Sequence, residues 1–131
     1  MKKRGKKIKN AEVRLPLGIK KNDYEFYARA ALVALEGNCA NEMQLTYLWS
    51  LAELCSRMAG SNDIHIVRHA ETLDRLVTMV KEGGYTCSNF AYASIKVSAD
   101  ILLRWFAVQK NKAVSSQAMA VVGEIDRRMA E

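Results

Sequence analysis

Apolar residues recur at helical spacing through most of this 131-residue chain. In residues 23–36 the apolar positions are three or four residues apart, and they comprise Tyr24, Tyr27, Ala31 and Leu35. Such positions share one side of an α-helix. Asn22 and Glu25 have the spacing of a capping box, and Gly37 follows where a helix end often needs a left-handed residue. The pattern predicts a helix over residues 23–36.

A second helix is predicted between Asn41 and Gly60. Asn41 and Gln44 again have the spacing of a capping box. Apolar residues cover most of the circumference, and they comprise Leu45, Leu48, Trp49, Leu51, Ala52, Leu54, Cys55, Met58 and Ala59. Because a helix that is apolar on nearly every side must be enclosed by others, we expect it at the centre of a bundle.

A third helix is predicted from a cap at Ser61 or Asn62 to the stop at Gly83 and Gly84. Its apolar stripe comprises Ile66, Ala70, Leu73, Val77 and Val80. Since neither Gly nor Pro interrupts this stripe, the pattern predicts one continuous helix.

Two more helices are predicted in the C-terminal third. The fourth begins at a cap on Thr86 or Ser88, and the fifth is expected after Ser115 or Ser116. The predicted inward stripe of the fourth comprises Phe90, Val97, Ile101, Trp105 and Val108, with Ile95, Leu102 and Phe106 beside it. The fifth carries Ala118, Val121, Val122, Ile125 and Met129. With short connections throughout, residues 22–131 are predicted to form an all-α, single-domain bundle of about five helices.

Charge divides the chain differently from hydrophobicity. Residues 1–21 contain nine of the twenty basic residues and a single acid, Glu12, whereas residues 22–131 contain eleven basic and thirteen acidic residues. The net charge of +6 therefore belongs to a basic N-terminal arm, residues 1–21. Its first part, residues 1–10, is too polar to offset its ordering entropy and is expected to be mobile. In residues 13–19 apolar side chains alternate, and because Pro16 argues against a central strand, we expect an extended segment packed on the bundle.

A block of one charge sign typically binds something anionic: nucleic acid, a membrane surface or an acidic protein. The chain has no apolar run of the roughly 20 residues that a membrane helix requires, so we expect no membrane partner. We predict a non-enzymatic protein that binds nucleic acid or a nucleoprotein through phosphate contacts. The predicted contact residues are Lys2, Lys3, Arg4, Lys6, Lys7, Lys9 and Arg14 in the arm, with Lys96, Arg104, Lys110 and Lys112 in the most positive part of the bundle. A merely solubilising tail is the alternative for the arm.

Three aromatic residues near one predicted turn, Tyr85, Phe90 and Tyr92, suggest a patch for a protein partner. The alternative function is therefore a protein-directed inhibitor of a host factor, which would act by occlusion through a helix face. A homodimer that buries extra apolar helix surface is a third hypothesis.

Catalytic and metal sites are not predicted. Ile66–Thr72 resembles the Arg-His signature of histidine phosphatases, but no second His follows His69, and a strand should precede the motif. His65 and His69 have a spacing that can chelate a metal, yet Ile66 stands where metalloproteases of this pattern carry Glu, and no third ligand can be identified. We therefore expect no catalytic residue, no metal and no cofactor.

The three cysteines form no CxxC pair, and free cysteine is among the most buried residue types. Cys39, Cys55 and Cys87 are expected to be reduced and mostly buried. No secretory signal pattern follows the basic start of the chain, so we predict a cytoplasmic protein.

The chain as a whole resembles small helical proteins encoded by bacteriophages and prophages of Gram-negative bacteria. The resemblance depends on the basic opening Lys2–Lys9, the Trp49-x-Leu-Ala-Glu-Leu helix, the Thr86-Cys-Ser turn and Leu103-Arg-Trp. It implies a regulator or inhibitor of a host system, including the anti-CRISPR type, that acts by binding. It supplies no site residues.

Overall fold

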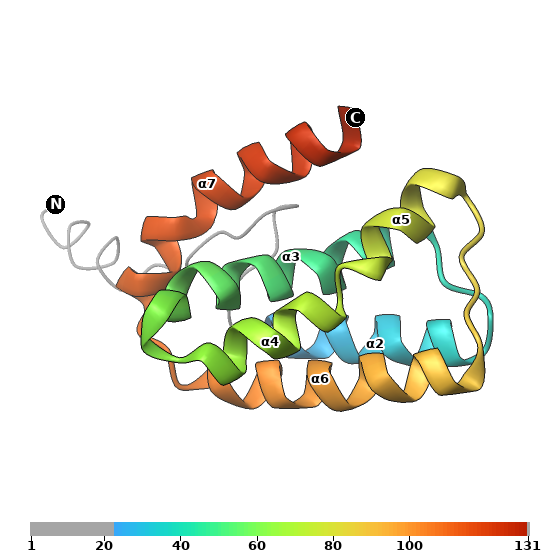
Figure 1. Ribbon diagram of the computed structural model, residues 1–131, viewed down its shortest axis with the longest axis horizontal. Coiled ribbons are helices and arrows are strands. Elements are labelled where there is room, and N and C mark those ends of the chain that lie inside the picture. The colour runs from blue at the N-terminus through green and yellow to red at the C-terminus, as the bar shows by residue number, and fades with distance from the viewer. Residues whose placement is uncertain (1–22, 131) are drawn as a thin grey trace, which may run out of the picture.

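The computed structural model describes residues 23–130, which fold into a helical bundle (Figure 1). Its helices are α2 (Tyr24–Glu36), α3 (Glu42–Ala59), α4 (Ile64–Thr72), α5 (Arg75–Glu82), α6 (Asn89–Ala107) and α7 (Asn111–Ala130), and the 3₁₀ turn η3 (Gly60–Asn62) joins α3 to α4. No β-strand occurs in this range, so the predicted all-α class is confirmed. Residues 1–22 and 131, with the predicted mobile and extended halves of the arm, lie outside the described residues.

Helix α3 occupies the centre of the bundle, as its sequence predicted. It packs against α2, α4, α5, α6 and α7, and it lies between α7 and α6 in Figure 1. Leu45, Leu48, Leu51, Leu54 and Cys55 on this helix are fully buried. Because these side chains point in several directions around the helix axis, each neighbouring helix covers a different part of the α3 surface.

Polar caps fix where the long helices begin. The Asn41 side chain accepts a hydrogen bond from the Gln44 amide (2.9 Å), and the Gln44 side chain accepts one from the Asn41 amide (3.0 Å), which completes the predicted capping box of α3. Ser88 caps α6 by accepting from the Ala91 amide at 3.1 Å. The predicted cap at Asn22 lies outside the described residues.

The prediction that Gly37 takes a left-handed conformation at the end of α2 was wrong. Gly37 has φ −85°, and the left-handed residue is Asn38, with φ 57°. Asn tolerates this region better than most residues, so the reversal of the chain moves one position along. At the end of α5, Gly83 does take the left-handed conformation, with φ 76°.

The predicted third helix is divided into α4 and α5, and this is a correction to the sequence analysis. At the break, the Leu73 amide bonds to the Ala70 carbonyl and the Leu76 amide to the Leu73 carbonyl, each at 3.0 Å, so two contacts span three residues instead of four. Helix α4 packs on α3 and α6, whereas α5 turns away onto α3 and α7 (Figure 1). One side of the N-terminal part of α6 consequently stays exposed.

The inward face of α6 also differs from the prediction. Its buried residues are Ile95, Ser98, Ala99, Leu102, Leu103 and Phe106. From the predicted stripe, Phe90, Val97 and Val108 are 83%, 58% and 77% exposed, and Ile101 and Trp105 are half-buried. Helix α6 carries two apolar stripes side by side, and only one of them can face the contacts with α2, α3 and α4.

Helix α7 begins at Asn111, before the predicted caps at Ser115 and Ser116. Both serine hydroxyls instead donate back within the helix, to the carbonyls of Lys112 (3.3 Å) and Ala113 (2.9 Å). The buried side of α7 comprises Val114, Ala118, Val121 and Ile125, and this side packs mainly on α3.

Candidate binding surfaces

Three of the predicted basic contact residues lie around the turn between α6 and α7. Arg104, Lys110 and Lys112 are exposed, and none of them forms an ion pair with a carboxylate within residues 23–130. Their positive charges are therefore not neutralised locally and are available to an anionic partner. The other predicted contacts, from Lys2 to Arg14, lie outside the described residues.

Lys96, the fourth predicted contact in the bundle, is engaged within the protein. Its ammonium lies 3.2 Å from Asp100 Oδ2, while Arg29 Nη1 of α2 lies 2.9 Å from Asp100 Oδ1. Partial burial acts to raise the pKa of Asp100, but the hydrogen bonds from Arg29 and Lys96 outweigh it and lower this pKa. The structure thus separates Lys96 from the three unpaired cations of the α6–α7 turn.

The chain enters the bundle beside that turn. Tyr24, the first residue of α2, packs edge-to-face on Phe106 near the end of α6, with ring centroids 5.6 Å apart. The Tyr24 hydroxyl donates to the Tyr47 carbonyl at 2.8 Å and is also hydrogen-bonded to Ser50. Burial raises the pKa of this hydroxyl, which keeps it neutral. Residue 24 is therefore a fixed attachment point at the same end of α6 as Arg104.

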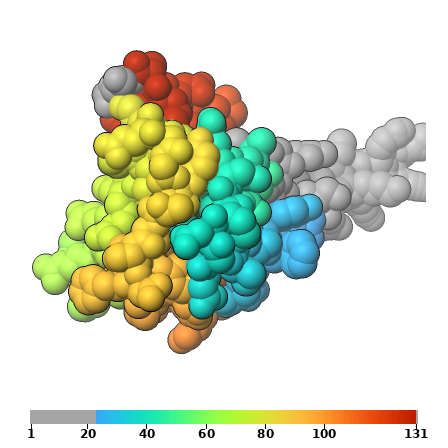
Figure 2. All heavy atoms as spheres, turned by 90° about the vertical axis from the view of Figure 1, so that its right-hand side faces the viewer, coloured from blue at the N-terminus to red at the C-terminus, as the bar shows by residue number. Residues whose placement is uncertain are grey.

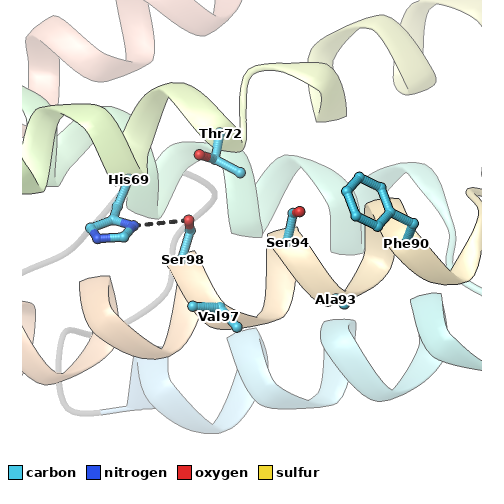
Figure 3. A pocket seen from close by; sticks show the side chains of 7 residues that line it. All are labelled: His69, Thr72, Phe90, Ala93, Ser94, Val97 and Ser98. Atoms are coloured by element: carbon cyan, nitrogen blue, oxygen red, sulfur yellow. Dashed lines mark hydrogen bonds between the residues drawn. The ribbon is translucent and has the colours of Figure 1, made fainter.

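A shallow groove runs between α4 and α6 (Figure 3). Its hollow, about 400 Å³ in volume, is lined by His69 and Thr72 from α4 and by Phe90, Ala93, Ser94, Val97 and Ser98 from α6. At one end His69 Nδ1 lies 3.0 Å from Ser98 Oγ, and at the other end the Phe90 ring projects from the first turn of α6. The groove is the exposed side of α6 that the break between α4 and α5 leaves uncovered.

The three aromatic residues of the predicted partner patch differ in exposure. Phe90 projects into solvent, whereas Tyr85 and Tyr92 are half-buried against the core. Burial, together with the nearby Glu36 carboxylate at the end of α2, raises the pKa of the Tyr92 hydroxyl. The connection from α5 to α6 and the connection from α2 to α3 both lie at the end of the bundle that faces the viewer in Figure 2. Of the three, Phe90 alone offers a largely free ring.

The Arg-His heptapeptide Ile66–Thr72 is helical, whereas the phosphatase signature that it resembles follows a strand. His65 is exposed and His69 is bonded to Ser98. Within residues 23–130, no three His, Cys, Asp or Glu side chains are placed to share a metal ion.

The three thiols are free, and they differ in environment. Cys39 is exposed, Cys87 is half-buried, and Cys55 is buried between α3 and α6, with its sulfur 3.8 Å from the Leu102 carbonyl. Burial raises the pKa of the Cys55 thiol strongly, so it stays protonated and is a poor nucleophile. The expectation of mostly buried cysteines is correct for Cys55 and wrong for Cys39.

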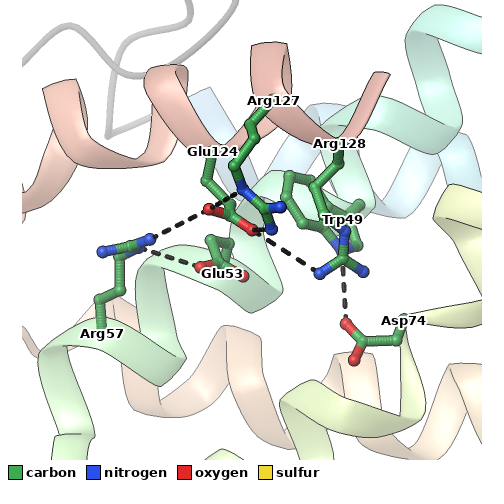
Figure 4. Close-up of polar contacts among 7 residues, drawn as sticks. All are labelled: Trp49, Glu53, Arg57, Asp74, Glu124, Arg127 and Arg128. Carbon is green, nitrogen blue, oxygen red and sulfur yellow. Dashed lines mark hydrogen bonds and ion pairs between the residues drawn. The ribbon is translucent and has the colours of Figure 1, made fainter. Parts of the chain in front are cut away.

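A polar network that the sequence analysis missed joins α3, α5 and α7 (Figure 4). The Trp49 indole nitrogen lies 3.4 Å from Asp74 Oδ1, and the Arg128 guanidinium lies over the Trp49 ring at 5.4 Å. Glu124 approaches Arg57 at 3.7 Å, Arg127 at 2.5 Å and Arg128 at 3.7 Å. Foremost the hydrogen bond from Arg127, and also the two other arginines, lower the pKa of Glu124.

This network fastens α7 to the bundle. Its members lie 25 to 79 positions apart in sequence, so no local pattern could have indicated that they meet. The adjoining hollow of about 220 Å³ is lined by Glu53, Glu71, Asp74 and Glu124 together with Arg128. Because the arginines neutralise much of this acidity, the arrangement stabilises the fold and offers no separate site.

Comparison with known proteins gives no match: no protein-family model fits the chain, and neither a curated protein nor a solved structure is significantly similar to it. Across the helices of residues 23–130, none has the combination of length and apolar composition that crossing a bilayer requires.

Proposed function

We propose that this protein binds nucleic acid or a nucleoprotein through its basic N-terminal arm and does not act as an enzyme. The observation that carries the proposal is the separation of charge: residues 1–21 have nine basic residues against one acid, and the rest of the chain is slightly acidic. A positive segment of this kind neutralises backbone phosphates and releases counterions, which gives affinity without reading the base sequence.

The described part of the chain supports the proposal at one end of the bundle. Arg104, Lys110 and Lys112 are exposed, without a carboxylate partner in residues 23–130, and Tyr24 anchors the start of α2 against Phe106 on the last turns of α6. The arm and these three cations are therefore joined to the bundle in the same region. Phosphates that contact the arm can extend over the α6–α7 turn.

The resemblance to bacteriophage-encoded proteins suggests where such a target would be found. A regulator of a host system would meet host nucleic acid or a host nucleoprotein. This part of the proposal depends on the resemblance alone.

A salt titration of binding to mixed-sequence duplex and single-stranded DNA tests the proposal. We expect binding at low salt that weakens linearly on a log–log plot, with a slope of about −0.9 per neutralised phosphate on duplex DNA. Deletion of residues 1–10 should remove most of the affinity. The double variant Lys110→Ala and Lys112→Ala should make the slope shallower by up to about two such contacts.

Lys81→Ala provides the matched control, because Lys81 is exposed near the end of α5 and was not predicted as a contact. It should leave the slope unchanged. The proposal is refuted if the full chain does not bind at low salt, or if removing residues 1–10 leaves binding as it was.

A further inference from the structure

The exposed side of α6 carries an apolar line with the spacing of a coiled-coil seam. Phe90, Val97, Ile101 and Val108 follow one another at intervals of seven, four and seven residues. Phe90, Val97 and Val108 are largely exposed and Ile101 is half-buried. Over this range a helix rises about 27 Å, and a partner helix can follow the line for its whole length.

The neighbouring side of α4 supplies the second wall of the surface. His69 and Thr72 line the groove beside Val97 (Figure 3). His65 and Arg68 precede these two residues by four positions, so they lie on the same side of α4 one turn earlier. The wall is therefore polar and carries the positive charge of Arg68.

The same surface has cations and lacks carboxylates. Arg104 follows Ile101 by three positions and Val97 by seven, which places it beside the apolar line. The acids of α4 and α6 are Glu71 and Asp100. Glu71 faces the hollow shared with α3 and α7, and Asp100 pairs with Arg29 on α2, so both point to other sides.

We propose that this α4–α6 face is a docking site for an acidic amphipathic helix of a partner protein. The apolar line would receive the hydrophobic side of that helix, while Arg68 and Arg104 would attract the acidic residues that flank it. Phe90, at the open end of the groove, is the natural anchor, because exposed aromatic side chains contribute most to such interfaces. This proposal is independent of the nucleic-acid proposal, and it specifies a partner for the protein-directed alternative.

Charge and shape argue against the other occupants. A second copy of the face would bring Arg68 and Arg104 near their own equivalents without an acid to compensate them. The arm of the same chain is even more basic than the face. Bases of a nucleic acid stack on aromatic rings, yet Val97, Ile101 and Val108 are aliphatic, and Phe90 is the one largely exposed ring of the line.

A synthetic helical peptide of about three heptads, with Leu at the a and d positions and Glu at the e and g positions, provides the probe. Its affinity for the full chain is measured by fluorescence anisotropy. We expect Val97→Asp to weaken binding at least about tenfold, since it places a charge in the centre of the line. Arg104→Glu should weaken this peptide and strengthen one in which Lys replaces Glu.

Val33→Asp is the matched control, because Val33 is 68% exposed on α2 and the substitution changes the charge equally. It should leave affinity within about twofold of the unmodified chain. A peptide with Ser in place of Leu measures attraction to the arm alone, and it should bind far more weakly.

The inference is overturned if the Leu/Glu peptide does not bind, if the Ser/Glu peptide binds as tightly, or if the two Asp variants behave alike. It is also overturned if light scattering shows a dimer that Val97→Asp converts to a monomer, because a second copy would then cover the face. DNA binding is measured separately, so failure of one proposal leaves the other intact.

Discussion

The orientation of α6 can be tested by comparing Leu102→Ala with Phe90→Ala. The two residues lie on the same helix, and both belong to apolar stripes of its sequence. Leu102 is fully buried, whereas Phe90 is 83% exposed. The structure therefore predicts that the smaller deletion has the larger effect on stability.

The magnitudes follow from burial. Truncation of a fully buried leucine to alanine costs about 2–5 kcal/mol of unfolding free energy, because apolar contacts are lost and a cavity is left. Complete burial of a phenylalanine is worth about 1.5–3 kcal/mol, and the small covered part of Phe90 accounts for less than about 0.5 kcal/mol. The better helix propensity of alanine offsets part of that, so Phe90→Ala should be nearly neutral.

Urea unfolding of the full chain, followed by the fluorescence of Trp49 and Trp105, measures both effects. We expect a large drop in the unfolding midpoint for Leu102→Ala, and almost none for Phe90→Ala, with unchanged slopes. A loss of more than about 2 kcal/mol for Phe90→Ala would refute the reasoning. It would mean that another part of the chain or a second copy covers this face.

Three further predictions concern single groups. Tyr24→Phe should lower the unfolding free energy by about 1 kcal/mol, because it removes buried hydrogen bonds to α3, while Tyr27→Phe on the exposed side should change it by less than about 0.5 kcal/mol in the same urea assay. Cys39 should react with a thiol reagent at once and Cys55 only on unfolding, so equally rapid modification of both in the native protein would contradict the assigned burial. The pKa of Asp100 is lowered in the folded state, so its contribution to stability is present above its unfolded pKa of about 3.9 and is lost as pH falls through the lower folded value. Asp100→Asn should flatten the acid limb of the stability profile between about pH 5 and pH 2, and an unchanged limb would count against the ion pairs.

Local signals in the sequence predicted the helix boundaries well where a side chain itself makes the cap. Asn41 with Gln44, Ser88 and Gly83 all act where their spacing indicated. In these places the partner atoms lie within a few residues of each other, so the pattern contains the whole interaction. Asn38 shows the limit of this reasoning, because either of two adjacent residues could reverse the chain after α2.

The face of α6 could not be predicted in the same way. Its sequence contains two apolar stripes, and the choice between them depends on how α2, α3 and α4 pack against Ile95, Ala99 and Leu102. The break after Thr72 likewise has no Gly or Pro to mark it, although the Asp74 carboxylate there lies close to the Trp49 indole of another helix. Since the groove results from both features, the candidate docking face became visible only with the tertiary structure.

The basic contact residues were predicted from composition, and the structure adds a distinction between them. Lys96 is paired with Asp100, while Arg104, Lys110 and Lys112 have no acid partner within residues 23–130. The sequence could not separate them, because the partner that matters for Lys96 is positioned by the helix and shared with α2.

The attachment of α7 has a consequence for partial unfolding. This helix packs on α3 and touches α5, while α2, α4 and α6 make their main contacts among themselves and with α3. Detachment of α7 alone would uncover Trp49 and the carboxylates of Glu53 and Asp74, yet leave the remaining helices packed. A cooperative unit of this kind opens at a lower free energy than the whole domain, so the backbone amides of α7 would exchange with solvent ahead of those in α3.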